Sequence, residues 1–95
     1  MNKILKLITV IYFILISSNL AFGKENFFDE ALKMYKNKKY ADARFMLERN
    51  IVYNPKDAKS YLYLAKIYNH EEKQKKEEHN LETTLLIEPD NEEAI

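Results

Sequence analysis

The fold is decided by residues 55–89, PKDAKSYLYLAKIYNHEEKQKKEEHNLETTLLIEP, which begin and end at the only two prolines of the chain. The sequence numbers of Pro55 and Pro89 differ by 34. Each of them closes a stretch with helical apolar periodicity, and the residues before them match at the same offsets. A fixed period of this length with a helix–turn–helix pattern inside it is typical of helical repeat arrays.

The sequence before this stretch is helical in pattern as well. After Gly23 the chain has no glycine, and Ala, Leu, Lys and Glu are abundant, which favours helix over strand. Asn54-Pro55 is expected to end one helix, with Asn54 in the left-handed cap conformation. Asp57 is expected to cap the next helix, and Asn91 takes the same place before a fifth helix, which has only begun when the sequence reaches Ile95. We therefore expect complete helices at residues 26–37, 40–53, 58–70 and 74–87.

Apolar residues recur every three to four positions, so each helix has a face that is expected to point inward. The first half of the fourth helix, residues 74–80, is entirely polar. The expected inward residues are Phe27, Ala31 and Met34, with Phe28, Leu32 and Tyr35 in a parallel stripe; Tyr40, Ala43, Leu47 and Ile51; Tyr61, Leu64, Ala65 and Tyr68; and Leu81, Leu85 and Ile87.

The segment 61–68, YLYLAKIY, resembles the first-helix signature of the tetratricopeptide repeat, which is an aromatic residue, then leucine, a small residue and tyrosine at fixed spacing. The second-helix part of that signature is matched by Ala43, Leu47 and Pro55. The resemblance covers residues 26–95. It implies an all-α fold of antiparallel helix–turn–helix repeats, a TPR-like α-solenoid. The first repeat would span residues 24–57, the second would span residues 58–91, and a truncated third repeat would start at residue 92.

Four residues depart from the family pattern. Glu30 stands where leucine is usual, and Asn50 stands where a small residue is usual. Gln74 replaces an aromatic residue, and Glu77 replaces an alanine at which the helices pack closely. The second pair is therefore expected either to splay at residues 74–80 or to present that end to solvent. The alternative to a repeat array is a plain array of four helices joined as hairpins.

The resemblance also implies a concave groove, lined by the first helix of each pair, in which a partner protein or peptide lies. Aromatic and aliphatic residues mixed with lysine and asparagine suit an amphipathic or acidic partner segment. Phe28 and Leu32 have the alternative role of packing on a neighbouring helix. The clamp with which some members hold a C-terminal carboxylate is not supported, because Asp29 and Tyr63 occupy its key positions. The expected groove residues are Phe28, Leu32, Tyr35, Lys36, Lys59, Leu62, Lys66, Asn69 and His70.

Residues 1–23 have the organisation of a secretory signal peptide: two lysines, an apolar run from Leu7 to Ile16, and Ala21 and Gly23 at the −3 and −1 positions of a cleavage site. The alternative is an anchor that stays attached to the inner membrane, although about 20 apolar residues are needed to span the bilayer. Export to the periplasm is expected. Cleavage would leave 13 basic and 15 acidic residues, a net charge of −2, which disfavours nucleic acid as a partner. Because the chain has no cysteine, no disulfide is available to it there.

No pattern of catalytic residues is present, so the chain is predicted not to be an enzyme and to need no cofactor. His70 and His79, with the glutamates between them, suggest a metal site, but metal-binding histidines on a helix usually stand four residues apart. The charged run 71–78 is interpreted as a solvated turn. No metal site is therefore predicted.

These observations predict an exported protein–protein interaction module, a scaffold or adaptor that holds a partner segment in its groove. One alternative is a membrane-tethered repeat protein that acts in envelope assembly or cytochrome maturation. A second alternative is a small metal-handling protein that uses histidine and glutamate. Repeat arrays generally need three or more units. Two repeats and the start of a third imply either a fragment of a longer chain or an interface completed by a partner or a second copy.

Overall fold

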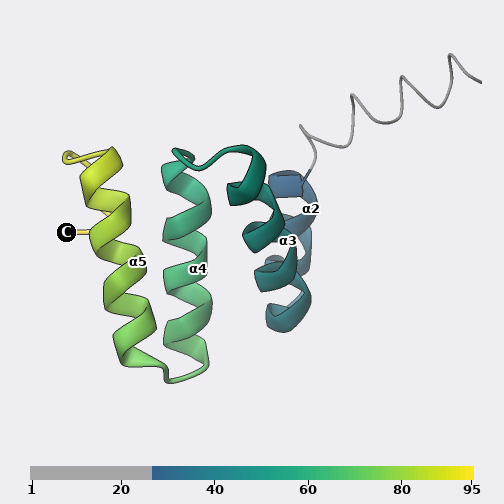
Figure 1. The fold of residues 1–95 in the computed structure, drawn as a ribbon. Coiled ribbons are helices and arrows are strands. Elements are labelled where there is room, and N and C mark those ends of the chain that lie inside the picture. Colours follow the sequence, from purple (N-terminus) through teal and green to yellow (C-terminus); the bar gives the residue numbers. More distant parts are fainter. Residues whose placement is uncertain (1–26) are drawn as a thin grey trace, which may run out of the picture.

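The computed structural model describes residues 27–95, which form four α-helices and no strand. Their bounds are α2, Phe27–Lys36; α3, Tyr40–Tyr53; α4, Ala58–His70; and α5, Gln74–Ile87 (Figure 1). Turns continue the chain from residue 88 to Ile95. The all-helical prediction is confirmed for these residues. The predicted signal peptide and the predicted start of the first helix at Asn26 lie outside the described residues.

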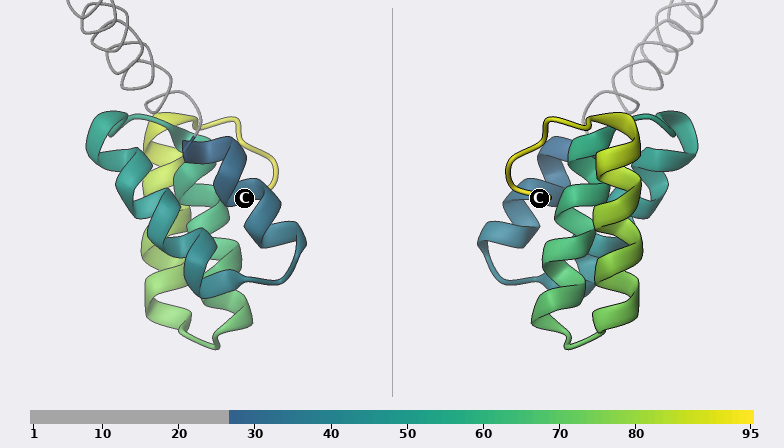
Figure 2. Two further views of the ribbon diagram at one scale, coloured as in Figure 1. Left: turned by 90° about the vertical axis from the view of Figure 1, so that its right-hand side faces the viewer. Right: turned by 90° about the vertical axis from the view of Figure 1, so that its left-hand side faces the viewer.

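Consecutive helices run antiparallel and lie beside one another (Figure 1). The connections α2–α3 and α4–α5 lie at one end of the molecule, and the α3–α4 connection lies at the other end. Helix α4 packs against both α3 and α5, so it occupies the middle of the described part. The residues that follow α5 turn back along it, and the chain end lies beside α5, on the side away from α3 and α2 (Figure 1); Figure 2 shows the same return in side view.

The two turns at the same end share an uncommon backbone conformation. Lys38, between α2 and α3, has φ 61°, and Glu72, between α4 and α5, has φ 59°. In each turn the next residue donates its N–H across the helix end, from Lys39 to the Met34 carbonyl and from Lys73 to the Tyr68 carbonyl. This is the bond pattern that ends a helix at a left-handed residue.

The backbone bonds of the turns and caps recur along the chain. Seven such bonds lie between residues 33 and 60, and each has a counterpart whose donor and acceptor numbers are both higher by 34. Matched bonds are nearly equal in length, as in the bond from Asn54 to Asn50 at 2.8 Å and its counterpart from Glu88 to Thr84 at 2.8 Å. The donors in the first set are Asn37, Lys38, Lys39, Ala43, Asn54, Asp57 and Ser60, and those in the second are Glu71, Glu72, Lys73, Glu77, Glu88, Asn91 and Ala94.

The predicted left-handed conformation of Asn54 is wrong. Asn54 has φ −130° and ψ 73°, outside both the left-handed and the helical regions. The cause is Pro55, whose ring disfavours helical angles at the residue before it and pushes that residue toward extended conformations. The left-handed residues are instead Lys38 and Glu72, in the turns without proline.

Asp57 is the N-cap residue of α4, as predicted, but its side chain makes no capping bond to the helix backbone. Its carboxylate oxygen Oδ2 instead accepts hydrogen bonds from the Ser60 hydroxyl at 2.6 Å and from the Asn50 amide at 3.0 Å. Asn91, predicted to take the equivalent place, does accept such a bond from the Ala94 N–H at 3.1 Å. Residues 92–94 form a turn, so no fifth helix is present among the described residues.

The core lies between α2, α3 and α4. Two small residues, both without exposed surface, lie where α2 and α3 meet: Ala31 and Ala43. Because their side chains are small, the helices can approach closely. Helix α4 is buried on more than its predicted face, because helices cover it on two sides. The cluster comprises Ala31, Ala43, Leu47, Leu64, Ile67 and Tyr68, with Phe28, Met34, Tyr35, Tyr40, Met46, Ile51 and Tyr63 packed around it.

Helix α5 contributes less to the core than its sequence pattern predicts. Leu81, Leu85 and Ile87 are only half-buried, and the fully buried residue of α5 is Thr84, whose hydroxyl donates to the Asn80 carbonyl at 2.8 Å. The reason is that α5 has α4 as its only extensive helix neighbour in the described part. The polar half of α5 faces solvent, with five of residues 74–80 exposed, and α4 and α5 stay side by side along their length (Figure 1).

Candidate functional site

An unbroken series of ring contacts connects α2, the start of α3 and α4. The Phe28 ring meets Tyr63 edge to face at 5.6 Å, and Tyr63 meets Tyr35 in the same way at 5.2 Å. Tyr35 contacts Tyr40 at 5.6 Å, and Tyr40 stacks on His70 at 4.5 Å. We call these five side chains the aromatic row. Edge-to-face contacts of this kind stabilise by about 0.5–1.5 kcal/mol beyond their buried area, so the row fixes α2 against α4.

Two lysines of α4 lie over rings of the aromatic row. The Lys59 ammonium is 4.7 Å from the centre of the Phe28 ring, and the Lys66 ammonium is 4.8 Å from the centre of the Tyr63 ring. These residues are two helical turns apart, so both side chains leave the same side of α4. Exposed cation–π contacts contribute about 0.5–1 kcal/mol each. The chain thus presents the same lysine-over-ring pair twice along one helix face.

One of these pairs already holds a carboxylate. Lys66 Nζ lies 2.7 Å from Glu93 Oε2, in the segment that follows α5. The hydrogen bond that the Lys66 ammonium donates to the Glu93 carboxylate raises the pKa of Lys66, against the smaller opposing effect of burial. Lys59, in contrast, has no carboxylate partner in the part of the chain that the structure describes.

The structure brings some of the predicted groove residues together and separates others. Phe28, Tyr35 and His70 belong to the aromatic row, and Lys59 and Lys66 lie over it. Phe28 also packs against the core, as the alternative interpretation predicted. Leu62 is buried, with 5% of its surface exposed, so its side chain offers little contact area. The remaining predicted residues are Asn69, which is exposed, and Leu32 and Lys36, which line a separate pocket of about 520 Å³ with Asp29, Glu30 and Lys33.

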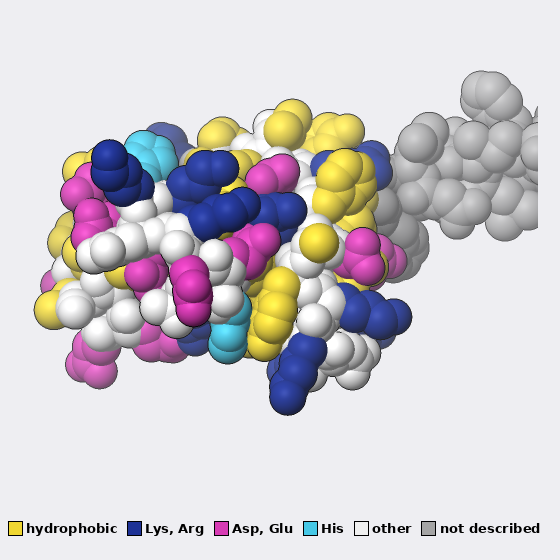
Figure 3. Space-filling view, turned by 90° about the horizontal axis from the view of Figure 1, so that it is seen from below, with side chains coloured by type: hydrophobic (Ala, Val, Ile, Leu, Met, Phe, Trp, Pro, Cys, Tyr) yellow, Lys and Arg dark blue, Asp and Glu magenta, His cyan; other side chains and the backbone are white. Residues whose placement is uncertain are grey.

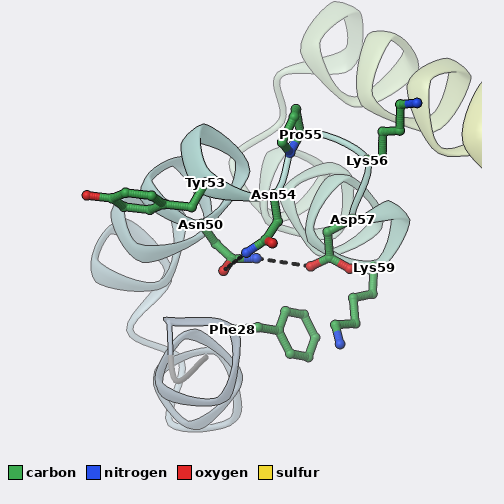
Figure 4. A pocket seen from close by; sticks show the side chains of 8 residues that line it. All are labelled: Phe28, Asn50, Tyr53, Asn54, Pro55, Lys56, Asp57 and Lys59. Carbon is green, nitrogen blue, oxygen red and sulfur yellow. Dashed lines mark hydrogen bonds between the residues drawn. The ribbon is translucent and has the colours of Figure 1, made fainter. Parts of the chain in front are cut away.

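A larger pocket of about 720 Å³ opens beside the end of the aromatic row (Figure 4). Phe28 and Lys59 point into the same space from α2 and α4, below the hydrogen bond from Asn50 to Asp57. The opposite wall comes from the end of α3 and from the α3–α4 connection. The lining residues are Phe28, Asn50, Tyr53, Asn54, Pro55, Lys56, Asp57 and Lys59.

The back of this pocket is held by a buried polar cluster. Asn50 is 3% exposed, and its amide donates to Ser60 Oγ at 2.8 Å and to Asp57 Oδ2 at 3.0 Å. The Ser60 hydroxyl in turn donates to Asp57. Within residues 27–95, no buried side-chain nitrogen or oxygen lacks a partner. Asn50 therefore links α3, the α3–α4 connection and α4 by hydrogen bonds.

The end of the molecule that carries the α2–α3 and α4–α5 turns has basic and acidic side chains interleaved (Figure 3). The histidine side chains lie apart on this surface, and His70 stacks on Tyr40. Among residues 27–95, no three His, Asp or Glu side chains come together as a metal site. None of the helices described is both long and apolar enough to cross a membrane.

Sequence reasoning missed Tyr40 and Glu93 as parts of this site and treated Tyr63 only as an obstacle to a carboxylate clamp. Tyr63 is the centre of the aromatic row. A usable signal was present, because Tyr63 stands three residues before Lys66 and therefore on the same side of α4. The contact of Lys66 with Glu93 had no comparable local signal, since 27 positions separate the two residues.

Comparison of the chain with family models, curated proteins and solved structures found no match.

Proposed function

We propose that the chain is a protein–protein interaction module built from tetratricopeptide-like repeats, and that a partner segment binds along the face formed by α2 and α4. The observation that carries the proposal is the recurrence of seven turn and cap hydrogen bonds at a constant offset of 34 in sequence number. A repeat of both sequence pattern and backbone bonding is what stacked helix–turn–helix units require.

The chemistry of the α2–α4 face supports a protein or peptide as the ligand. Phe28, Tyr35 and Tyr63 are half-buried, so each ring keeps some surface available to a partner. Lys59 and Asn69 are exposed on α4 and supply charge and hydrogen-bond donors. Aromatic residues flanked by polar ones are enriched where proteins bind each other. The proposal includes neither catalysis nor a cofactor, and no observation in residues 27–95 favours the metal-handling alternative.

We also propose export, on the basis of the signal-like pattern in residues 1–23. Mass spectrometry of the N-terminus of the protein from its native cells tests this. A chain that begins at Lys24 supports a cleaved signal and a periplasmic module. An intact N-terminus in the membrane fraction supports the tethered alternative.

Site-specific photo-crosslinking in cells tests the interaction face. A photoreactive amino acid is placed at Leu32 or Asn69, on the proposed face, and in a control at Val52, which is 75% exposed on α3. We expect a discrete adduct of the same mass from Leu32 and Asn69, and none of that mass from Val52. Adducts of equal yield at all three positions, or none at Leu32 and Asn69, would overturn the proposed face.

A further inference from the structure

We propose that the Phe28–Lys59 pair binds the carboxylate of an acidic side chain in the partner segment, while an apolar side chain next to it enters the pocket beside Phe28. This inference rests on the proposed function and specifies the chemistry of the partner. The occupant is an acidic peptide segment whose glutamate or aspartate is flanked by an apolar residue.

The second lysine-over-ring pair of the chain already binds a carboxylate. At the second pair, Lys66 lies over the Tyr63 ring and Glu93 Oε2 lies 2.7 Å from its ammonium. Glu93 comes from a segment remote in sequence and is 63% exposed at its side chain, so its carboxylate approaches from the solvent side. A partner carboxylate at Lys59 would approach in the same way.

The first pair lacks the carboxylate. Lys59 lies over Phe28 with nearly the same separation, 4.7 Å against 4.8 Å, and no acidic side chain of residues 27–95 pairs with it. An ammonium held over a ring has fewer side-chain conformations to lose on binding. The Phe28–Lys59 pair is thus an ordered cation without an anion, which is the complement of an acidic side chain.

The charges around the pocket favour an anion. Lys56 and Lys59 line it, against the single carboxylate of Asp57. That carboxylate accepts hydrogen bonds from Asn50 and Ser60 through Oδ2. The formal charge of the lining side chains is therefore +1.

The pocket also has room for an apolar group. Its volume of about 720 Å³ is in the range of sites that enclose small ligands, and Phe28 and Pro55 provide apolar walls. Phe28 and Lys59 point toward a common space in Figure 4, so a side chain beside the bound carboxylate would contact the Phe28 ring. A peptide with leucine next to glutamate supplies both groups.

The test uses nuclear magnetic resonance titration of the isotope-labelled protein, purified from cells that express the full chain. The probe is the acetylated and amidated pentapeptide Gly-Leu-Glu-Leu-Gly, and its isosteric control has glutamine in place of glutamate. The Lys59→Gln variant removes the proposed cation. The Lys75→Gln variant removes one exposed lysine from α5 and matches the change in net charge.

We expect the glutamate probe to shift the amide signals of Phe28 and Lys59, and to bind about two- to fivefold more weakly in Lys59→Gln, the effect of one partly exposed ion pair. The Lys75→Gln variant should bind the glutamate probe as tightly as the parent protein does. The parent protein should bind the glutamine probe about as weakly as Lys59→Gln binds the glutamate probe. A Glu93→Gln variant should gain a second set of shifts around Lys66, because it removes the resident carboxylate.

Equal binding of the glutamate and glutamine probes overturns this inference, and so does a Lys59→Gln affinity equal to that of the parent. Failure of the inference is distinct from failure of the proposed function. If both probes shift the α2–α4 face equally, or if photo-crosslinks form at Leu32 and Asn69 while neither probe binds, the interaction face stands without the acidic preference.

Discussion

Lys38 and Glu72 occupy equivalent places in the α2–α3 and α4–α5 turns, and both hold the left-handed backbone conformation, with φ 61° and 59°. A side chain with a Cβ atom makes this conformation unfavourable by about 1–2 kcal/mol, whereas glycine adopts it without that cost. We expect Lys38→Gly and Glu72→Gly each to raise the free energy of unfolding by about 0.5–1 kcal/mol, after allowing for the greater freedom of glycine in the unfolded chain. Thermal or urea unfolding monitored by circular dichroism measures this.

The matched controls are the next residues, Lys39 and Lys73, whose φ values of −88° and −104° are accessible to any residue. Glycine at either position should lower stability, since it adds only unfolded-state freedom. A loss of stability in Lys38→Gly as large as that in Lys39→Gly would contradict the prediction.

The helix bounds were predictable because the chain marks them locally. Three of the four predicted helices have the bounds of α3, α4 and α5, and the predicted end of the first, Asn37, is one residue beyond the end of α2. Pro55 and Pro89 stop two of the helices, since proline cannot continue the backbone bonding. The left-handed turns were not predictable, because neither Lys38 nor Glu72 belongs to a residue type that prefers that conformation.

The site was only partly predictable, for a related reason. Periodicity places Phe28, Tyr35 and Lys59 on particular helix faces, but it does not say which residue of another helix they meet. The central role of Tyr63 depends on how α2 and α4 are brought together, and the pairing of Lys66 with Glu93 depends on the path of the chain after α5. Leu62 shows the same limit, since a position on the expected groove face is buried once its neighbours are in place.

The Asn50 cluster should stabilise the α3–α4 connection. Asn50→Ala removes the bonds to Asp57 and Ser60 from an almost fully buried site, so we expect it to lower the free energy of unfolding by about 1–3 kcal/mol. Ser60→Ala removes an overlapping set of bonds. The double variant should therefore lose less than the sum of the single losses, by about 0.5–3 kcal/mol. Strict additivity in a double-mutant cycle by urea unfolding would argue against a cooperative cluster.

Arg44 on α3 links two helix pairs through Glu71 at the end of α4, with its Nη1 at 2.9 Å and 3.0 Å from the two carboxylate oxygens. Both side chains are about one-quarter exposed. A double-mutant cycle with Arg44→Ala and Glu71→Ala should give a coupling of about 0.5–1 kcal/mol that decreases with added salt. The more exposed Lys66–Glu93 pair is the comparison, and its coupling should be smaller. A larger coupling for Lys66–Glu93 would contradict this ranking.

Tyr68 should make the protein sensitive to alkaline pH. Burial raises the pKa of its phenol above the ordinary value of 10.0, and the carboxylates of Glu48 and Glu71 act in the same direction, against Arg44. The native state therefore keeps a proton that the unfolded chain loses. The stabilisation is complete below pH 10.0 and decreases as the pH rises through the native pKa.

The raised pKa of Lys66 acts in the same direction, so the parent protein should lose stability through both groups. In Tyr68→Phe, the decrease in the urea midpoint between pH 8 and pH 11 should be smaller than in the parent. Parallel decreases in the two proteins would show that Tyr68 does not contribute.

Leu47 on α3 and Leu81 on α5 occupy equivalent places in the repeated pattern, yet Leu47 is 1% exposed and Leu81 is only half-buried. Leu47→Ala leaves a cavity in the cluster between α2, α3 and α4 and should lower the free energy of unfolding by about 2–5 kcal/mol. Leu81→Ala removes the same atoms from the outer helix α5, where solvent fills much of the space, and should cost less than half as much. The exposed Leu86, also on α5, is the control, and Leu86→Ala should change stability by less than about 0.5 kcal/mol. Urea unfolding of the variants under the same conditions measures these losses. If Leu47→Ala and Leu81→Ala lower the free energy of unfolding equally, α5 is covered by a surface that these four helices do not supply.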